Sequence, residues 1–413
     1  MRTDKLRNMK VAKQAISDLS PGLGATYWRL WTATGLSGLA DGVVKVALPL
    51  VAVQYTHSPT LIAGLAVALT LPWLLFSLPA GALADRLDRR RIMLVANGIR
   101  AGVLAALVLA VTVGAGSLWV LYVAALCVGT AETLYDTTAQ SIVPQTVGPA
   151  LLARANGRLY AVELTANQFV GPPLAGVLTV AGVAVAIGAP LVLWLAAVGV
   201  LTLVRGVYRA ERAAPATMRA DIAAGLRFLW RHRLLRTLAA IVGVFNLATS
   251  ATSAVLVLYA LGPMGLSEQG YGILLTATAA GSLLGSFVAE WMARVCGRVR
   301  SLTLAILAGA MLVGAPAVTA NPFLVGAAAF VGGVGVVVWN VISVSLRQRI
   351  TPNELMGRVN SAYRLLAWGI MPVGAAAGGL LADWLGLRTV FLIMGMAVLV
   401  LLPFTARLQL TEV

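Results

Sequence analysis

Charged residues are scarce in this chain. Asp, Glu, Lys and Arg make up 11% of its 413 residues, whereas a soluble domain averages about 25%. Cys127 falls in an apolar run and Cys296 beside a charged loop, so no disulfide framework is implied. Only His57 and His232 are available for a metal, and no glycine-rich stretch ends in the Gly-Lys-Ser/Thr of a nucleotide-binding loop. These absences exclude an ATP-driven pump and predict a protein without metal, cofactor or enzymatic activity.

Long apolar runs dominate instead. Hydrophobic residues make up 59% of the chain, and stretches of about 20 residues, enough to cross about 30 Å of hydrocarbon, recur from end to end. The sequence therefore predicts an all-α membrane protein with twelve transmembrane helices in two six-helix bundles, at 27–204 and 237–406. The helices are expected at about 27–55, 60–84, 92–113, 117–140, 159–181, 183–204, 237–261, 270–292, 301–319, 322–346, 359–382 and 388–406.

Basic residues outnumber acidic ones, 31 against 15, which gives a net charge of +16. On the predicted helices nearly all of these cations lie at one face, with Lys45 inside a helix and only Arg388 at the opposite face. This asymmetry indicates that the basic face is cytoplasmic, and it argues against nucleic-acid binding. Both terminal segments, 1–26 and 407–413, and the basic linker 205–236 are then cytoplasmic. Within the linker, 222–230 is expected to lie as a helix on the membrane surface.

The two halves carry a diverged repeat. Arg154-Ala155-Asn156 recurs 204 residues later as Arg358-Val359-Asn360, and each copy follows a proline. Gly81 recurs as Gly285 at the same offset. Two further glycines, Gly171 and Gly176, correspond to Gly374 and Gly379. An offset close to half the chain length is expected of two related six-helix bundles.

A charged hairpin joins the second and third predicted helices. It reads Gly81-Ala82-Leu83-Ala84-Asp85-Arg86-Leu87-Asp88-Arg89-Arg90-Arg91, and it resembles the loop between helices 2 and 3 of the major facilitator superfamily of secondary transporters. Its small residues are expected to let helices approach closely. We expect Asp85 to pair with a helix end or with an arginine across the two halves, as a gate. Arg86, Arg89 and Arg90 are expected to hold the loop at an anionic membrane surface. Family members often have glycine at the position of Asp88, which predicts a different turn here.

Two stretches resemble the drug:proton antiporter branch of this superfamily, which includes macrolide and siderophore exporters. One is Leu39-Ala40-Asp41-Gly42, followed by Ala47-Leu48-Pro49-Leu50, in the first helix, and the other is the repeated Arg-x-Asn motif. In the fifth helix, Gly171-Pro172-Pro173-Leu174-Ala175-Gly176 resembles a motif associated with exporters, with Ala175 in place of one glycine. The arginine motif that many drug antiporters carry in the fourth helix is absent, since Ala125-Leu126-Cys127-Val128-Gly129 stands there.

The resemblance implies a monomeric secondary transporter of the bacterial plasma (inner) membrane. It would exchange protons for amphiphilic small molecules, such as drugs or macrolide-like and siderophore-like compounds, by alternating access. Two other functions of the same fold remain open, a lysophospholipid flippase and a symporter for nutrient uptake. The expected partners are the lipid bilayer, protons and the small-molecule substrate.

Ionisable side chains inside a membrane are costly, and each is a functional candidate by default. Asp41 and Lys45, four residues apart on the first helix, are expected to form an ion pair that either pins the bundle or exchanges a proton. The candidates for proton coupling are Asp41, which is favoured, Glu132, Asp136 and Glu163. The candidates for the cavity wall or for ion pairing are Lys45, Arg100, Asn246 and Asn340. An interfacial aromatic belt is expected from Trp28, Trp31, Trp73, Trp119 and Trp384.

Overall fold

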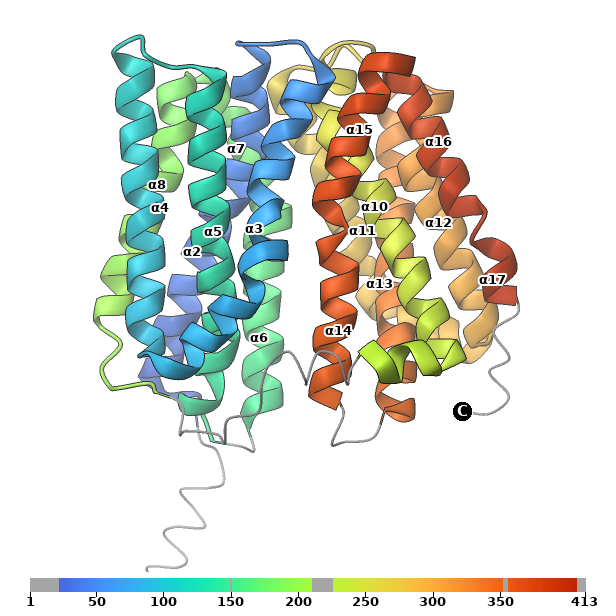
Figure 1. Cartoon of the computed structure of the whole chain (residues 1–413), viewed down its shortest axis with the longest axis horizontal. Coiled ribbons are helices and arrows are strands. Elements are labelled where there is room, and N and C mark those ends of the chain that lie inside the picture. The colour runs from blue at the N-terminus through green and yellow to red at the C-terminus, as the bar shows by residue number, and fades with distance from the viewer. Residues whose placement is uncertain (1–21, 149–150, 210–225, 352–355, 407–413) are drawn as a thin grey trace, which may run out of the picture.

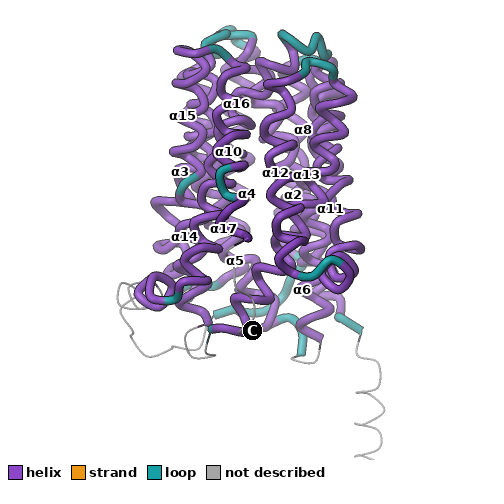
Figure 2. Tube along the Cα trace, turned by 90° about the vertical axis from the view of Figure 1, so that its right-hand side faces the viewer, coloured by secondary structure: helices purple, strands orange, loops and turns teal. Residues whose placement is uncertain are grey.

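The computed structural model describes residues 22–148, 151–209, 226–351 and 356–406 (Figure 1). Within these ranges a few helical residues, among them Asp85, Arg358 and Asn360, are described by their backbone only. The described residues form helices joined by short turns, and the trace contains no strand in these ranges (Figure 2). The predicted all-α class is confirmed.

The helices form two bundles that stand side by side (Figure 1). The first comprises α2 (Gly24–Val53), α3 (Pro59–Arg86), α4 (Arg89–Thr112), α5 (Leu118–Ile142), the 3₁₀ turn η1 (Val143–Gln145), α6 (Leu152–Leu164), the π-helical η3 (Thr165–Val170), α7 (Gly171–Val180) and α8 (Val183–Thr202). The second comprises α10 (Arg233–Leu261), α11 (Glu268–Val295), α12 (Arg298–Val318), α13 (Pro322–Ile350), α14 (Met356–Gly369), α15 (Met371–Leu385), α16 (Leu387–Leu399) and α17 (Leu402–Ala406). We call these bundles the N-half and the C-half. Part of the predicted surface helix, residues 226–231, is helical and precedes α10.

The predicted fifth helix departs from the long, unbroken pattern. Eleven helices of the described chain are long and apolar enough to cross a membrane. The region predicted as 159–181 is instead divided into α6, η3 and α7, which have 13, 6 and 10 residues. Pro172 and Pro173 lack the N–H groups that would continue α6. The Gly171 N–H bonds to the Ala166 carbonyl, five residues back, in π-helical geometry. The apolar spans of the described chain therefore number eleven against the twelve predicted, and the three short segments together occupy the place of the fifth helix. The predicted helices 359–382 and 388–406 are also interrupted, because the first divides into α14 and α15 and the second into α16 and α17.

Capping side chains determine where several helices begin. The capping residues, each of which accepts a hydrogen bond from a first-turn N–H, include Ser58, Asp88, Ser117, Ser267 and Asn321. Such a bond satisfies a donor that has no partner within the helix. Asp88 accepts from the Arg91 N–H at 3.0 Å, so α4 begins at Arg89. The predicted start at 92 was three residues late, because the arginines form the first turn of the helix and not a loop.

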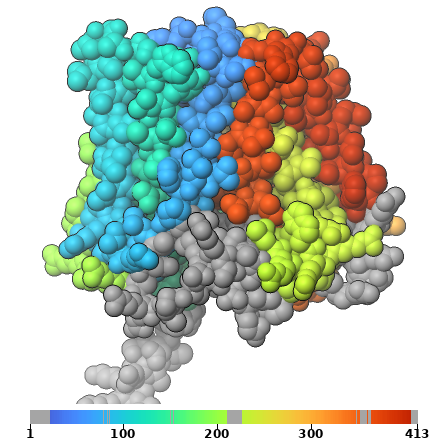
Figure 3. Space-filling view, viewed as in Figure 1, coloured from blue at the N-terminus to red at the C-terminus, as the bar shows by residue number. Residues whose placement is uncertain are grey.

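The two halves pack together at one end of the molecule, which we call the Asp383 end; the opposite end is the Asp88 end. There α3 packs on α15, and α7 packs on α11. A Cβ on Gly379 would lie 2.6 Å from the Cβ of Ala63, and one on Gly176 would lie 2.6 Å from the Glu268 carbonyl oxygen. Only glycine therefore permits these approaches. In the space-filling view α3, in blue, lies directly against α15, in red (Figure 3).

One polar contact joins the halves at this end. The Asp383 carboxylate, on α15, accepts hydrogen bonds from the Thr60 N–H at 3.2 Å and from the Ser58 hydroxyl at 3.3 Å. Ser58 is the N-cap of α3, and Thr60 lies in its first turn. A carboxylate of the C-half thus lies on the positive end of a helix of the N-half.

The repeated glycines occupy equivalent contacts in the two halves. Gly171 lies against Gly42 of α2, and Gly374 lies against Leu247 of α10, so each contacts the first long helix of its own half. Gly176 and Gly379, as described above, contact the second long helix of the opposite half. These equivalences support the diverged repeat inferred from the sequence.

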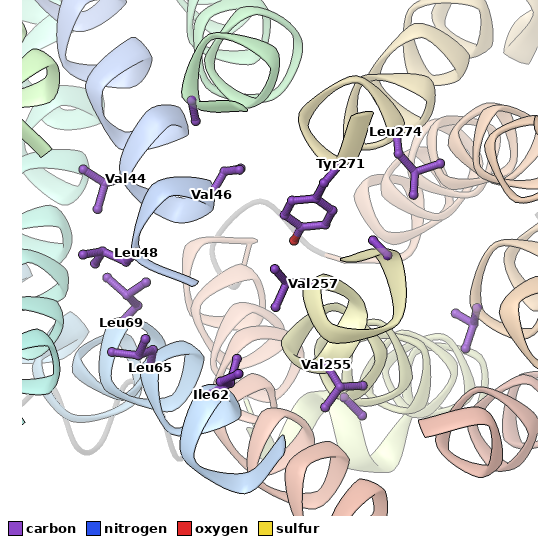
Figure 4. Packing of buried hydrophobic residues seen from close by; sticks show 14 of the residues in the cluster. Val44, Val46, Leu48, Ile62, Leu65, Leu69, Val255, Val257, Tyr271 and Leu274 are labelled. Atoms are coloured by element: carbon purple, nitrogen blue, oxygen red, sulfur yellow. The ribbon is translucent and has the colours of Figure 1, made fainter. Parts of the chain in front are cut away.

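Apolar side chains fill the space on both sides of the interface between the halves. Leu48, Leu65 and Leu69 pack between α2 and α3, while Val46 and Tyr271 extend toward the interface from α2 and α11 (Figure 4). Because Val46 and Tyr271 also belong to the wall of a central cavity, the core and the candidate site are continuous.

Candidate transport cavity

A cavity of about 750 Å³ lies between the two halves. Its wall extends from Ile62, in the part of α3 near the Asp383 end, to Gln140 and Tyr160, which are exposed in the part nearer the Asp88 end. Among the residues whose side chains are described, the charged ones that line it belong to the N-half: Asp41, Lys45, Glu132, Asp136 and Glu163. The polar residues that the C-half contributes are uncharged: Asn246, Thr249, Ser250, Ser253, Tyr271 and Thr278. In the part of the wall that the structure describes, charge is therefore concentrated on the N-half.

Asp41 is paired with a fully buried arginine. The Arg100 Nη1 lies 3.3 Å from the Asp41 Oδ1, and the side chains are 0% and 5% exposed. The same Nη1 donates hydrogen bonds to the Ser37 hydroxyl at 3.0 Å and to Asn97 Oδ1 at 3.2 Å. The guanidinium carbon lies 5.2 Å from the ring centroid of Tyr135 and 5.4 Å from that of Trp194, within reach of cation–π attraction. This setting fixes Arg100 firmly inside the N-half.

Lys45 has a different partner. Its Nζ lies 3.1 Å from the Glu132 Oε1, and the side chains are 45% and 9% exposed. The expected pair between Asp41 and Lys45 is therefore wrong: each is paired with a residue of another helix. A pair four residues apart on one helix contributes only about 0.2–0.5 kcal/mol. Arg100 of α4 and Glu132 of α5 instead place an opposite charge 3.3 Å from Asp41 and 3.1 Å from Lys45.

Asp136 and Glu163 complete the charged wall. Asp136 follows Glu132 by one turn of α5 and is half-buried, and Glu163 lies near the end of α6. Together with the two ion pairs, the network contains four carboxylates and two cations among the described residues. The two ion pairs include Asp41 and Glu132, and neither includes Asp136.

Two tryptophans meet across the halves. The rings of Trp73, on α3, and Trp368, on α14, lie edge to face with centroids 4.8 Å apart, and both line the cavity. The expectation that Trp73 belongs to an interfacial belt is wrong, because α3 extends from Pro59 to Arg86 and places Trp73 in its middle. Hydropathy alone could not distinguish a belt tryptophan from one that faces a cavity.

The two asparagine candidates have different positions. The Asn246 amide donates a hydrogen bond to the Ala367 carbonyl at 2.7 Å, and Asn246 lines both the central cavity and a smaller one of about 70 Å³ inside the C-half. Asn340 lines the smaller cavity, beside Trp339. The expectation that Asn340 lines the central cavity is therefore not met, because α13 packs among α10, α12 and α16 at that level.

The arginines of the 81–91 hairpin are held by protein and not only by a membrane surface. The Arg89 Nη1 donates to the Ser141 carbonyl at 2.9 Å, at the end of α5. The Arg90 Nη2 donates to the Thr202 carbonyl at 2.8 Å, at the end of α8. Both cations thus lie at the negative ends of helices. Arg86 is exposed. The Asp85 side chain is not among those described, so its expected role as a gate stays a prediction.

Gly81 has open space where a Cβ would stand, so the close helix approach expected there is not formed in this conformation. The equivalent glycine of the C-half, Gly285, does pack closely, with a Cβ that would lie 2.9 Å from the Val334 carbonyl oxygen. The repeat therefore predicted the position of Gly81 in its helix but not its contacts.

Asp88, where the family often has glycine, ties the chain after α8 to the hairpin. Besides capping α4, its carboxylate accepts from the Tyr208 N–H at 3.0 Å. The Arg89 N–H donates to the Tyr208 carbonyl at 3.0 Å, and Asp88 is 7% exposed. The start of the predicted linker 205–236 is thus docked on the N-half. No local pattern indicated this contact, since its partners are 120 residues apart.

The remaining motifs lie on α6, η3 and α7. Arg154 and Asn156 are exposed on α6, while the side chains of Arg358 and Asn360 lie outside those described. A Cβ on Gly42 would overlap the Asn167 carbonyl oxygen, and one on Gly171 would lie 2.7 Å from the Cα of Gly42. Pro172 lines the cavity. The resemblance motifs of the first and fifth helices therefore pack directly on one another.

The fold and the cavity together define a membrane transporter of the major facilitator type. The model of the transmembrane secretion effector family matches residues 16–413. The chain belongs to this family of the major facilitator superfamily.

Known proteins of similar sequence and structure agree with this assignment. The multidrug efflux pump Tap of Mycolicibacterium fortuitum is 30% identical over 384 residues, which cover 88% of this chain and 91% of Tap. The crystal structure of the nucleoside transporter NupG matches with a TM-score of 0.75 at 13% identity, covering 93% of this chain and 98% of NupG. A bacterial homologue of the iron transporter ferroportin, in an inward-facing state, matches with a TM-score of 0.73 at 17% identity, covering 92% and 99%. At these identities the two structures show the fold alone.

Proposed function

We propose that this protein exports amphiphilic cations in exchange for protons. The observation that carries the proposal is the charged wall of the cavity, where the described residues of the N-half form two ion pairs and the Asp136 carboxylate belongs to neither. Unbalanced negative charge is costly in a membrane interior, where the dielectric is low. A proton, or the positive charge of a substrate, would neutralise it. The relative named as a multidrug efflux pump supports export of drug-like molecules.

The geometry favours the Glu132–Asp136 pair over Asp41 as the proton carrier. Neutralising Asp41 would leave Arg100 as an unpaired buried cation, which typically costs several kcal/mol. Asp136 belongs to neither of the two ion pairs of the network, and it lies one turn from Glu132 on the cavity wall. A proton on Glu132 would release Lys45, whose side chain is 45% exposed. A substrate cation could then compete with Lys45 for the carboxylates.

The orientation follows from charge. Arg86, Arg89, Arg90 and Arg91 all lie at the Asp88 end, so we place this end in the cytoplasm. The contacts between α3 and α15 and between α7 and α11 then close the external side. A substrate would enter this conformation from the cytoplasm.

Reconstitution in liposomes tests the proposal. An imposed pH gradient should drive ethidium, an amphiphilic cation, across the membrane in vesicles that contain the protein. Asp136→Asn should abolish the gradient-driven movement while ethidium binding remains measurable. Glu290→Gln, which alters an exposed acid of α11 outside the cavity, is the matched control and should retain the wild-type rate.

Two results would change the assignment. If Asp136→Asn transports normally and Asp41→Asn does not, the coupling role returns to Asp41. If the wild-type protein moves no ethidium under a pH gradient of either direction, proton-coupled export of cations is refuted.

A further inference from the structure

The Arg-x-Asn motif of the N-half lies outside the cavity wall, where α6 packs on α2. Its middle residue, Ala155, is fully buried, and the Ala155 carbonyl accepts a hydrogen bond of 2.8 Å from the Tyr27 hydroxyl of α2. One turn later, the Arg158 carbonyl accepts a hydrogen bond of 3.1 Å from the Trp31 indole N–H. Two side chains of α2 thus hold the backbone of α6 against α2 at the Asp88 end.

Two arginine side chains follow one stripe of α6 at this contact. Arg154 and Arg158 are four residues apart on the helix, and residues at this spacing are neighbours on its surface, with Cβ atoms about 5–6 Å apart. The guanidinium carbon of Arg158 lies 5.3 Å from the ring centroid of Trp28, so the stripe borders α2. Arg154 is exposed and Arg158 is half-buried, which leaves the pair accessible from outside the bundle.

This arginine pair has no counter-charge among the described residues. Two like charges four residues apart on a helix repel each other. The printed carboxylate partners of cations in the described chain are Asp41 and Glu132, which pair with other cations inside the N-half. The next acid along α6, Glu163, lines the central cavity. An anion bound beside Arg154 and Arg158 would relieve their repulsion.

The aromatic side chains beside the pair indicate where such an anion lies. Helix α2 begins at Gly24, so Trp28 is in its second turn, and the indole is 42% exposed. The rings of Trp28 and Trp31 lie edge to face with centroids 5.5 Å apart. Tryptophans near the ends of membrane helices lie at the level of the lipid headgroups, and cation–π attraction holds the Arg158 guanidinium beside Trp28. The pair is therefore placed at the level of lipid phosphates.

We propose that Arg154, Arg158 and Trp28 form a binding site for one anionic phospholipid. A guanidinium can donate two parallel hydrogen bonds to a phosphate, and basic sites between helices at the membrane surface bind anionic headgroups. The lipid phosphate lies beside the two guanidinium groups, and an acyl chain covers the exposed face of Trp28. The site selects phosphatidylglycerol over phosphatidylcholine, because the choline cation offsets the charge of the same phosphate.

Tryptophan quenching by brominated lipids tests the site. The protein is reconstituted in phosphatidylcholine bilayers with increasing fractions of phosphatidylglycerol or phosphatidylcholine that carries bromine on its acyl chains, near the headgroup. The contribution of Trp28 is the difference in quenched fluorescence between the wild-type protein and Trp28→Phe. Each cation near the surface favours an anionic lipid about fivefold. We therefore expect brominated phosphatidylglycerol to quench Trp28 at a fraction about twentyfold lower than brominated phosphatidylcholine.

Two charge-matched double variants separate this site from general attraction to a basic surface. Arg154→Gln combined with Arg158→Gln should abolish the preference for phosphatidylglycerol at Trp28. Arg300→Gln combined with Arg349→Gln removes the same charge from two exposed positions at the Asp88 end of the C-half, and it should leave the preference unchanged. A preference that survives the first double variant, or that both double variants abolish equally, would refute the site.

A soluble phosphate distinguishes a lipid from a free anion. A millimolar excess of glycerol 1-phosphate should leave quenching by brominated phosphatidylglycerol unchanged, because this anion has no acyl chain to lie on Trp28. Reversal of the quenching by glycerol 1-phosphate would assign the arginines to a soluble phosphate and refute a lipid site. Equal quenching of Trp28 by the two brominated lipids in the wild-type protein would refute anionic selectivity, and the site with it.

Discussion

Replacing Asp383 by alanine should shift the protein toward the state that is open at the Asp383 end. The carboxylate accepts hydrogen bonds of 3.2 and 3.3 Å from Thr60 and Ser58 of the other half, and these bonds must break when the halves separate there. The contact is exposed, so a capping interaction of this kind contributes about 1 kcal/mol. A change of that size alters a two-state ratio about fivefold. A ratio of about ten to one would fall to about two to one.

Distance measurements between spin labels test this shift. Labels on cysteines introduced at Ala115 and Pro263, two exposed turns of opposite halves at the Asp383 end, report the separation there in a protein whose native cysteines are replaced. Asp383→Ala should increase the long-distance population, and Glu290→Ala, the loss of an exposed acid elsewhere, should not. Identical distance distributions in Asp383→Ala and wild type, under conditions where both populations are visible, would show that the contact does not hold the halves together.

Three further changes have defined expectations. Arg100→Leu leaves Asp41 buried without its cation and should lower the free energy of unfolding by about 3–5 kcal/mol. Thermal denaturation in detergent measures this loss, and an unchanged melting temperature would contradict the buried pair. Gly42→Ala places a methyl group on the Asn167 carbonyl and should destabilise by about 1–3 kcal/mol, whereas Gly98→Ala, which meets no atom within 4 Å, should be neutral or stabilising. Asp88→Ala removes the α4 cap and should lower the free energy of unfolding by about 0.5–2 kcal/mol. Hydrogen exchange at the Tyr208 amide should become faster. Unaltered exchange would show that the Asp88 carboxylate does not protect that amide.

Hydropathy and glycine spacing predicted much of the fold. The length of the apolar runs predicted the helices. The offset of about 204 residues between the halves predicted glycines in equivalent contacts, such as Gly176 and Gly379. Both signals are local or periodic, so a single sequence contains them. The break in the fifth helix was harder to predict from the sequence. The two prolines predicted a kink, but a π-helical turn before them depends on how η3 packs against Gly42.

The candidate site was predicted in composition but not in pairing. Asp41, Lys45 and Glu132 are conspicuous because charge is rare in these helices, yet their partners depend on how α2, α4 and α5 turn toward each other. A spacing of four residues suggested the pair Asp41–Lys45, and tertiary packing produced Asp41–Arg100 and Lys45–Glu132 instead. The docking of Tyr208 on Asp88 could not be predicted from the sequence. The resemblance marked Asp88 as a departure from the family, but nothing indicated a partner 120 residues away.

The edge-to-face tryptophans of the cavity provide an optical reporter that needs no label. Trp73 and Trp368 belong to different halves, and their ring centroids are 4.8 Å apart, close enough for their excited states to couple. Such coupling contributes a paired signal of opposite signs to circular dichroism in the ultraviolet, and it weakens steeply as two indoles separate. If the halves move apart at this level during transport, the signal should fade, and Trp73→Phe should abolish it. The motion of the unmodified protein could then be followed in real time, inside the membrane in which it works.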